Sequence, residues 1–232
     1  MNDESSMSTM QAAVRLVILS AIFPLFIFPF AGRWDWGMAW AVIAAMIIAT
    51  LVSRLFAFKM HPDLLNERTS SLDAENTKPW DKILSPAMGI TPLLILIVAG
   101  LDERFHWSPP LSMNLQVVGV VLVVIGYAFA TWAMLANRFF SAVVRIQTER
   151  GHQVVDNGPY AIVRHPGYSG SLIAEIGFPL ALSSLWALIP LALVFIVTVV
   201  RTRLEDQTLQ DELPGYVDFT TRTRFRLMPG IW

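Results

Sequence analysis

The sequence predicts an all-α integral membrane protein with about six transmembrane helices, because of its composition and its long apolar runs. Of its 232 residues, 54% are hydrophobic and only 15% are charged, which leaves too little polar surface for a soluble domain of this length. A bilayer crossing takes about 20 apolar residues, and the chain holds five such runs, the last of them long enough for two crossings. The 14 Phe and 8 Trp suit helix packing and membrane interfaces.

The expected crossings follow one another along the chain at short intervals. The first four lie at Ala12–Phe30, Trp36–Phe58, Ile83–Leu101 and Leu115–Ala136. The final run, Tyr168–Val200, holds about 33 residues, which is too many for one crossing. We therefore divide it near Ser183 and Ser184, just after Pro179, into a tight helical hairpin. Small residues in the fourth crossing are expected to let a neighbouring helix approach closely: Gly119, Gly126 and Ala130.

The basic residues predict which loops face the cytoplasm. Met1–Met10 is polar and acidic, unlike the start of a signal peptide, so we expect the first crossing to be retained. With six crossings both termini lie on one side, and only Arg33 and Arg104 of the 17 Lys and Arg lie on the other. The positive-inside rule makes the basic side cytoplasmic. That side holds three segments with nearly all the polar chemistry: Lys59–Lys82, Asn137–His165 and the tail from Arg201.

We therefore expect the functional site at the cytoplasmic face of a plasma or inner membrane. We divide the chain into amino-terminal transmembrane helices, residues 1–136, and a functional core, residues 137–232. The net charge of −1 gives no case for nucleic-acid binding, and the absence of cysteine excludes disulfides, zinc–thiolate sites and cysteine nucleophiles. We expect no metal site. No Gly-rich turn between a strand and a helix predicts a soluble type of cofactor domain.

The polar segment before the last apolar run carries the clearest functional signal. Asn157-Gly158-Pro159 predicts a tight turn. His165 precedes a proline and should be extended, whereas Pro166 suits the first turn of the next helix. The free backbone N–H groups of that helix start favour an anionic group. The alternative is an interfacial anchor, because Arg and Tyr also gather at membrane surfaces for hydration alone.

This segment resembles a known signature. Residues Gly158–Gly170, GPYAIVRHPGYSG, look like the motif of the isoprenylcysteine carboxyl methyltransferase family, which belongs with the membrane phospholipid methyltransferases. That family's second motif, R-x-x-x-E after the last membrane helix, is matched by Arg201 and Glu205, with Asp206 next. The resemblance covers about residues 137–232, and the loop Met60–Arg68 is similar to one in bacterial members.

The resemblance implies an S-adenosylmethionine-dependent methyltransferase with a cytoplasmic pocket that the tail helps to close. Arg201 matches the arginine on the substrate side, and Glu205 matches the carboxylate that binds the cofactor. The positions that match the lining of the cofactor pocket are Gln147, His152, Gln153, Val154, Val155, Tyr160, His165, Pro166, Gly167 and Tyr168. This implies that the turn around Tyr160–Tyr168 and the helix opening at Arg201 meet at the inner membrane surface.

The residue types fit this chemistry, although each has a simpler reading. Tyr160 and Tyr168 can pack on adenine or face a sulfonium. Without the upstream motif, Arg201 and Glu205 would be read as an ordinary salt bridge between residues four apart on a helix. Glu175, inside the fifth crossing, is either part of the substrate entrance or a helix-packing residue.

The methyl acceptor is left open between two chemistries. A carboxylate is already ionised at neutral pH and needs only positioning and exclusion of water, with Arg201 holding it by two parallel hydrogen bonds. An amine would need a base, for which His152 and His165 are the candidates. The expected substrate is a lipophilic or prenylated molecule that enters from the membrane lipids.

Two other functions compete with methyl transfer. One is a membrane NADPH-dependent reductase of sterol-like lipids, which the pattern of Arg201 and Glu205 disfavours. The other is a non-enzymatic transport protein. Transporters usually place polar residues near the middle of the bilayer, and here Glu175 is the one charged residue expected there.

Overall fold

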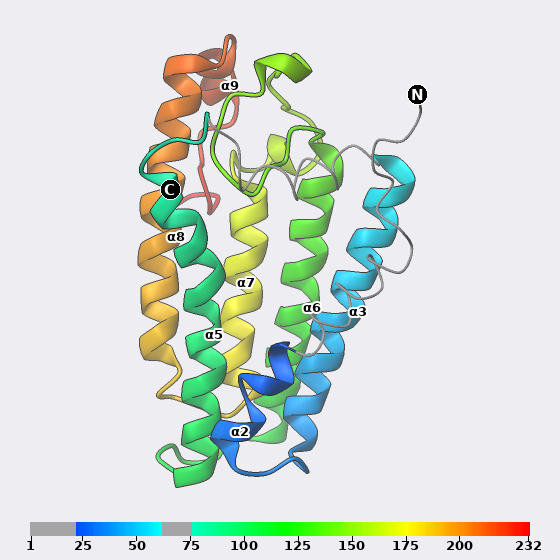
Figure 1. The fold of residues 1–232 in the computed structure, drawn as a ribbon, viewed down its shortest axis with the longest axis vertical. Helices are drawn as coiled ribbons and strands as arrows, with labels where there is room; N and C mark the ends of the chain where they lie inside the picture. The colour runs from blue at the N-terminus through cyan, green and yellow to red at the C-terminus, as the bar shows by residue number, and fades with distance from the viewer. Residues whose placement is uncertain (1–21, 62–75) are drawn as a thin grey trace, which may run out of the picture.

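The computed structural model describes residues 22–61 and 76–232, and these residues form helices and loops without a strand (Figure 1). The long helices lie side by side as a bundle, and α9 and the longer loops gather at one end of it. The α-helices are α2 (Phe28–Ala31), α3 (Gly37–Met60), α5 (Asp81–Phe105), α6 (Met113–Ala136), α7 (Pro166–Ala181), α8 (Leu188–Glu212) and α9 (Tyr216–Arg222). Two 3-10 turns lie at Thr148–Arg150 and Gly158–Ala161.

Three of the described helices, α3, α5 and α6, are long and apolar enough to cross a membrane. They coincide with the second, third and fourth expected crossings to within a few residues, which confirms an all-α membrane fold in this coarse form. The first expected crossing lies partly outside the described residues, and its described part belongs to the short apolar helical stretch Ile22–Ala31, which has a turn before α2. Helix α7 has only 16 residues, and the second half of α8 is charged. Neither helix is therefore both long and apolar enough to be counted with these three.

The last apolar run divides where the sequence predicts. Helix α7 ends at Ala181 and α8 begins at Leu188, with Ser183 in a left-handed conformation at φ 55° between them. The expected start of a helix at Arg201 is wrong, because α8 continues through Arg201 to Glu212. Glycine and proline, which end helices, are absent from residues 191–213 and return only at Pro214 and Gly215.

Helices α6 and α7 touch along a line of glycines. A Cβ atom on Gly126 of α6 would overlap the backbone of Ala174, and one on Gly170 of α7 would overlap the backbone of Ala130. This contact confirms the expected role of the small residues in the fourth crossing. The pair of helices fixes the position of Pro166, which is the first residue of α7.

The apolar core has one large part between the long helices and a smaller part at the end with α9. The smaller cluster is made of residues from α6, the 3-10 turn, the end of α8 and α9: Ala133, Tyr160, Leu213, Tyr216 and Phe219. Its burial holds the carboxy-terminal part of the chain against the Gly158–Ala161 turn. The two segments that carry the family motifs therefore lie at the same end of the bundle (Figure 1).

Candidate functional site

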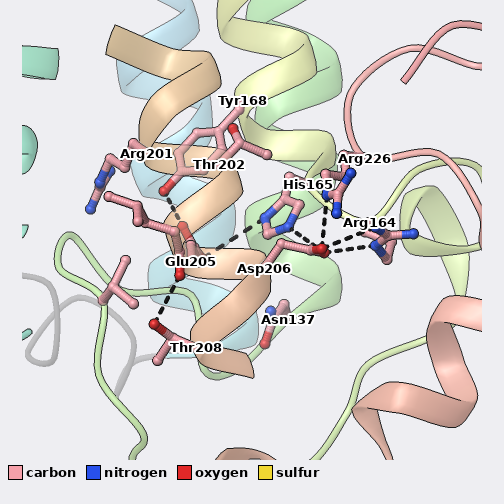
Figure 2. A network of polar contacts seen from close by, with 12 residues as sticks. Asn137, Arg164, His165, Tyr168, Arg201, Thr202, Glu205, Asp206, Thr208 and Arg226 are labelled. Atoms are coloured by element: carbon pink, nitrogen blue, oxygen red, sulfur yellow. Dashed lines mark hydrogen bonds and ion pairs between the residues drawn. The ribbon is translucent and has the colours of Figure 1, made fainter. Parts of the chain in front are cut away.

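Asp206 on α8 is the buried centre of a group of charged and polar side chains that come from several parts of the chain (Figure 2). We call this group the Asp206 cluster; its other members are Arg164, His165, Tyr216 and Arg226. Asp206 accepts two hydrogen bonds from Arg164, at 2.7 Å and 3.0 Å, and one from Arg226 at 2.8 Å. Nε2 of His165 lies 3.3 Å from its Oδ1, and the hydroxyl of Tyr216 donates to it at 3.1 Å. Burial opposes ionisation of Asp206, but the hydrogen bonds from His165 and Arg164 outweigh it and hold the pKa of this carboxyl well below its usual range.

The carboxy-terminal tail is fastened to the start of α7 through its backbone as well. The N–H groups of Arg164 and His165 donate to the carbonyls of Phe225 and Arg226, both at 2.9 Å. The hydroxyl of Ser169 donates to the carbonyl of Leu227 at 2.6 Å. The tail, the turn and α8 therefore meet as expected from the two motifs.

Glu205, one residue before Asp206, carries the contact between the two motifs. The hydroxyl of Tyr168 donates a hydrogen bond to its Oε2. Nδ1 of His165 lies 4.0 Å from its Oε1, and the rings of His165 and Tyr168 are nearly parallel, with centroids 5.9 Å apart. In Figure 2 His165 lies between the two carboxylates. These three residues form one polar wall on the side of α8.

A cavity of about 920 Å³ opens in front of this wall. Of the residues that the sequence assigns to the site, those that line it are Gln147, His152, Gln153, Val154, Val155, Tyr160, His165, Gly167, Tyr168, Arg201 and Glu205. Pro166 is buried but is not part of the lining. Both halves of the chain contribute, because α3 and α5 also line the cavity, for example through Thr50 and Met88.

Two of the predicted cofactor residues are already engaged with their own neighbours. Gln147 is only 1% exposed. It donates to the carbonyl of Phe139 at 2.7 Å and accepts from Arg150 at 2.5 Å, so its amide holds the loop together. The hydroxyl of Tyr160 accepts a hydrogen bond from Asn137 at 3.1 Å. Tyr160 also lines the cavity, so its ring is the part that remains for a cofactor.

Arg201 pairs with Asp81 of α5 and not with Glu205. Its Nε and Nη2 donate to the two carboxylate oxygens of Asp81 at 2.7 Å and 3.0 Å, and both side chains are buried. In Figure 2 its guanidinium points away from the Asp206 cluster. The two parallel hydrogen bonds expected for a substrate carboxylate are therefore made to Asp81, and the simpler reading of Arg201 and Glu205 as a local salt bridge is wrong.

His152 lies against the ring of Phe139, with centroids 4.6 Å apart, at the edge of the cavity. Partial burial and the positive charges of Arg145 and Arg150 lower the pKa of this histidine from 6.5 to about 4. His152 is therefore neutral at physiological pH and a weak base.

We expect the ring of His152 to stay neutral between pH 6 and 8 and to take up a proton only near pH 4. An unfolded histidine is protonated from pH 6.5 downward, so the contribution of neutral His152 to stability is complete above that pH and is lost as the pH falls toward 4. A titration followed by NMR, with the His152 signals assigned by their loss in His152→Asn, tests this. A midpoint near 6.5 would contradict it.

Several site residues have no signal in the local sequence. Asp81 lies in the amino-terminal half, far along the chain from its partner Arg201. Arg226, in the carboxy-terminal tail, donates to Asp206 and belongs to the Asp206 cluster.

Glu175 is 9% exposed with no hydrogen-bond partner for Oε2 among the described residues, and it is not part of the cavity lining. In the part of the chain that the structure describes, no group of three His, Asp or Glu is placed to hold a metal.

Comparisons with known proteins find one family and several relatives that match part of the chain. Residues 118–211 match the isoprenylcysteine carboxyl methyltransferase (ICMT) family. This range includes α7, most of α8 and the segment between α6 and α7. The match covers less than half of the chain, and these residues are similar to the ICMT family. The resemblance found in the two motifs is thus confirmed, and both motifs of the ICMT family lie on the wall of the cavity.

Individual relatives match shorter stretches of the chain. A probable protein-S-isoprenylcysteine O-methyltransferase of Oryza sativa subsp. indica is 44% identical over 61 residues, which are 26% of this chain and 32% of the relative. The protein-S-isoprenylcysteine O-methyltransferase of Saccharomyces cerevisiae is 36% identical over 100 residues, 40% of each chain. The cobalt-zinc-cadmium resistance protein CzcN of Cupriavidus metallidurans is 30% identical over 120 residues, 50% of this chain and 49% of the relative. The chain thus spans about a third to a half of the length of these relatives.

Proposed function

We propose that this chain is an integral, multi-pass membrane methyltransferase that uses S-adenosylmethionine to methylate the carboxylate of an isoprenylcysteine-like or other lipophilic substrate. The observation that carries the proposal is the contact of Tyr168 with Glu205 on the wall of the cavity, which joins the two ICMT-family motifs. S-adenosylmethionine supplies a methyl group on a sulfonium cation, and the other steps depend on side chains of this chain.

The lining of the cavity fits such a cofactor. Glu205 offers an anionic group to a cationic one, and the rings of Tyr160 and Tyr168 offer surfaces for an adenine or a sulfonium. At the start of α7, Pro166 has no N–H group and the N–H groups of Tyr168 and Ser169 donate to the carbonyl of His165, so a cofactor carboxylate would have to rely on other groups of the lining. The volume of about 920 Å³ is near the upper end of the range of roughly 300–1,000 Å³ for small-molecule sites.

A carboxylate acceptor fits the site better than an amine. An amine must lose a proton, and an efficient base has a pKa near the working pH. His152, with a pKa of about 4, is too weak for that role, and Nε2 of His165 faces Asp206. A carboxylate needs no base, so the site would act by positioning its oxygen and by excluding water.

The apolar surroundings support a lipophilic substrate that reaches the cavity from the bilayer. The cavity extends to Ala49 and Thr50 of α3 and to Met88 and Gly89 of α5, which are two of the membrane-length helices. We place the protein in the membrane with six crossings, a hairpin of α7 and α8, and the cavity and both termini on the cytoplasmic side, because the basic loops lie there. Residues 137–232 would form the methyltransferase core.

The function is tested with detergent-purified protein and labelled S-adenosylmethionine. We expect methyl transfer to an S-farnesylcysteine acid and none to its amide or to lipid amines. A parallel titration with NADPH should show no binding. Binding of NADPH without binding of S-adenosylmethionine would favour the reductase alternative and contradict the proposal.

Replacing Arg201 by Ala is expected to lower kcat/KM for the S-farnesylcysteine acid by about 100-fold while S-adenosylmethionine binding persists, because the substrate loses its positioning contact. Since this change leaves Asp81 buried without its partner, Arg201→Lys is the companion variant that keeps the charge. Calorimetry for the cofactor and initial rates for the acid measure both effects. Equal loss of cofactor binding and methyl transfer would contradict the separation of roles.

A further inference from the structure

The guanidinium of Arg201 uses most of its hydrogen-bond donors inside the protein. Nε and Nη2 donate to Asp81, and Nη2 also donates to the carbonyl of Ala142 at 2.9 Å. In the part of the chain that the structure describes, Nη1 contacts only the sulfur of Met88, at 3.3 Å, and a thioether is a weak acceptor. Among the described residues, Nη1 is therefore the one nitrogen of this fork without an oxygen acceptor. Arg201 and Met88 both line the cavity, and Nη1 is the guanidinium nitrogen that lies next to Met88.

Asp81 lies behind Arg201, at the first residue of α5. It is 0% exposed and is not part of the cavity lining, so it does not meet the substrate itself. The positive end of the α5 dipole favours a carboxylate at this position. Asp81 also accepts a hydrogen bond from the N–H of Val144 at 2.6 Å, and Ser85, one turn later, donates to Ala142 at 2.9 Å. One carboxylate thus fixes both Arg201 and the loop beside it.

We propose that Asp81 is a positioning residue for the reaction, which fixes the guanidinium of Arg201 so that Nη1 faces the cavity beside Met88 and donates to the substrate carboxylate. This inference rests on the proposed function and deepens it. The substrate carboxylate takes the place of the Met88 sulfur as the acceptor of Nη1. The substrate carboxylate is held by a single donor nitrogen of the Arg201–Asp81 ion pair, which has no net charge. This hydrogen bond weakens when methylation removes the charge of the substrate.

The placement of Asp81 gives the amino-terminal half a part in the reaction. Asp81 lies outside residues 118–211, which match the ICMT family. The aromatic ring of Tyr168, which belongs to the polar wall, lies 5.5 Å from the guanidinium carbon of Arg201. A shift of Arg201 therefore also changes the distance between its guanidinium and the polar wall. Asp81 therefore sets the relation between substrate and cofactor without touching either.

Asp81→Glu tests the inference, because it keeps the charge and moves the carboxylate by one methylene. We expect kcat/KM for the S-farnesylcysteine acid to fall by about 30-fold, since small displacements of a positioning group have effects of this order, while the Kd for S-adenosylmethionine stays within about 2-fold. Asp102→Glu is the matched control. Asp102 is a buried carboxylate at the other end of α5, hydrogen-bonded to Ser108 and Ser184 and away from the cavity. The Asp102→Glu substitution should leave kcat/KM for the acid and the Kd for S-adenosylmethionine unchanged.

A double-mutant cycle separates positioning from a merely structural role. In an Arg201→Lys background, Asp81→Glu should lower kcat/KM by less than about 3-fold further, because Asp81 acts through Arg201. Additive effects of the two substitutions would overturn the inference, as would an Asp81→Glu protein that no longer binds S-adenosylmethionine. If the wild-type protein transfers no methyl group to the acid, the proposed function and this inference fall together. If it does and the cycle is additive, the inference alone falls.

Discussion

Replacing Glu205 by Gln is expected to raise the Kd for S-adenosylmethionine by about 10- to 100-fold, because a hydrogen bond to a charged group contributes roughly 1.5–3 kcal/mol. The amide keeps the size of the side chain and can still accept a hydrogen bond from Tyr168. What it removes is the negative charge on the wall of the cavity, which is the only part of Glu205 that attracts a sulfonium or an ammonium. Isothermal titration of the detergent-purified protein measures the change.

Glu212→Gln is the matched control for this experiment. Glu212 lies on the same helix, in an exposed ion pair with Lys78, and exposed ion pairs contribute about 0–1 kcal/mol. Its substitution should leave cofactor binding unchanged. An unchanged Kd in Glu205→Gln would show that the carboxylate does not meet the cofactor and would remove Glu205 from the site.

The sequence predicts those parts of the site that depend on residues adjacent to one another in the chain. Pro166 begins α7, as a proline in the first turn of a helix should. His165 before it lies outside the helix as expected, but its φ of −123° and ψ of 62° are not those of the extended residue that the sequence predicts. The glycines of α6 pack against α7 because a residue without a side chain permits close approach. The meeting of Tyr168 and Glu205 follows from the resemblance to the ICMT family, which carries information about distances that local patterns do not.

The parts that the sequence does not predict are pairings between distant charged residues. A buried arginine needs a partner, but nothing near Arg201 in the chain says that the partner is Asp81 and not Glu205. Arg226 is likewise separated from Asp206 by the end of α8 and by α9, so its sequence neighbours do not indicate that pairing. The sequence also does not predict the extension of α8 past Arg201, because the change there from apolar to charged residues resembles a helix boundary. Such a change marks only where the environment of the helix alters.

Replacing Asp206 by Ala is expected to cause the largest loss of stability of the substitutions considered, about 3–5 kcal/mol, because removing one partner of a buried charge network leaves the others uncompensated. Arg164 is 6% exposed and loses both of its hydrogen bonds to the carboxylate. The tail loses the contact of Arg226 at the same time. Thermal unfolding in detergent measures the loss of stability, and trypsin cleavage after Arg226 measures the release of the tail.

The dependence on pH distinguishes a loss of this charge from a loss of packing. The pKa of Asp206 is lowered in the folded protein from an ordinary value of 3.8, so its contribution to stability is complete above that pH and is lost as the pH falls below it. Wild-type protein should therefore lose stability in acid more steeply than Asp206→Ala. Asp211→Ala is the control, since Asp211 lies on the exposed side of α8 and, within residues 22–61 and 76–232, accepts only from Gln207. This substitution should change stability by less than about 0.5 kcal/mol. Equal unfolding of the two variants would mean that the Asp206 cluster does not hold the tail, and closure of the cavity would then need another cause.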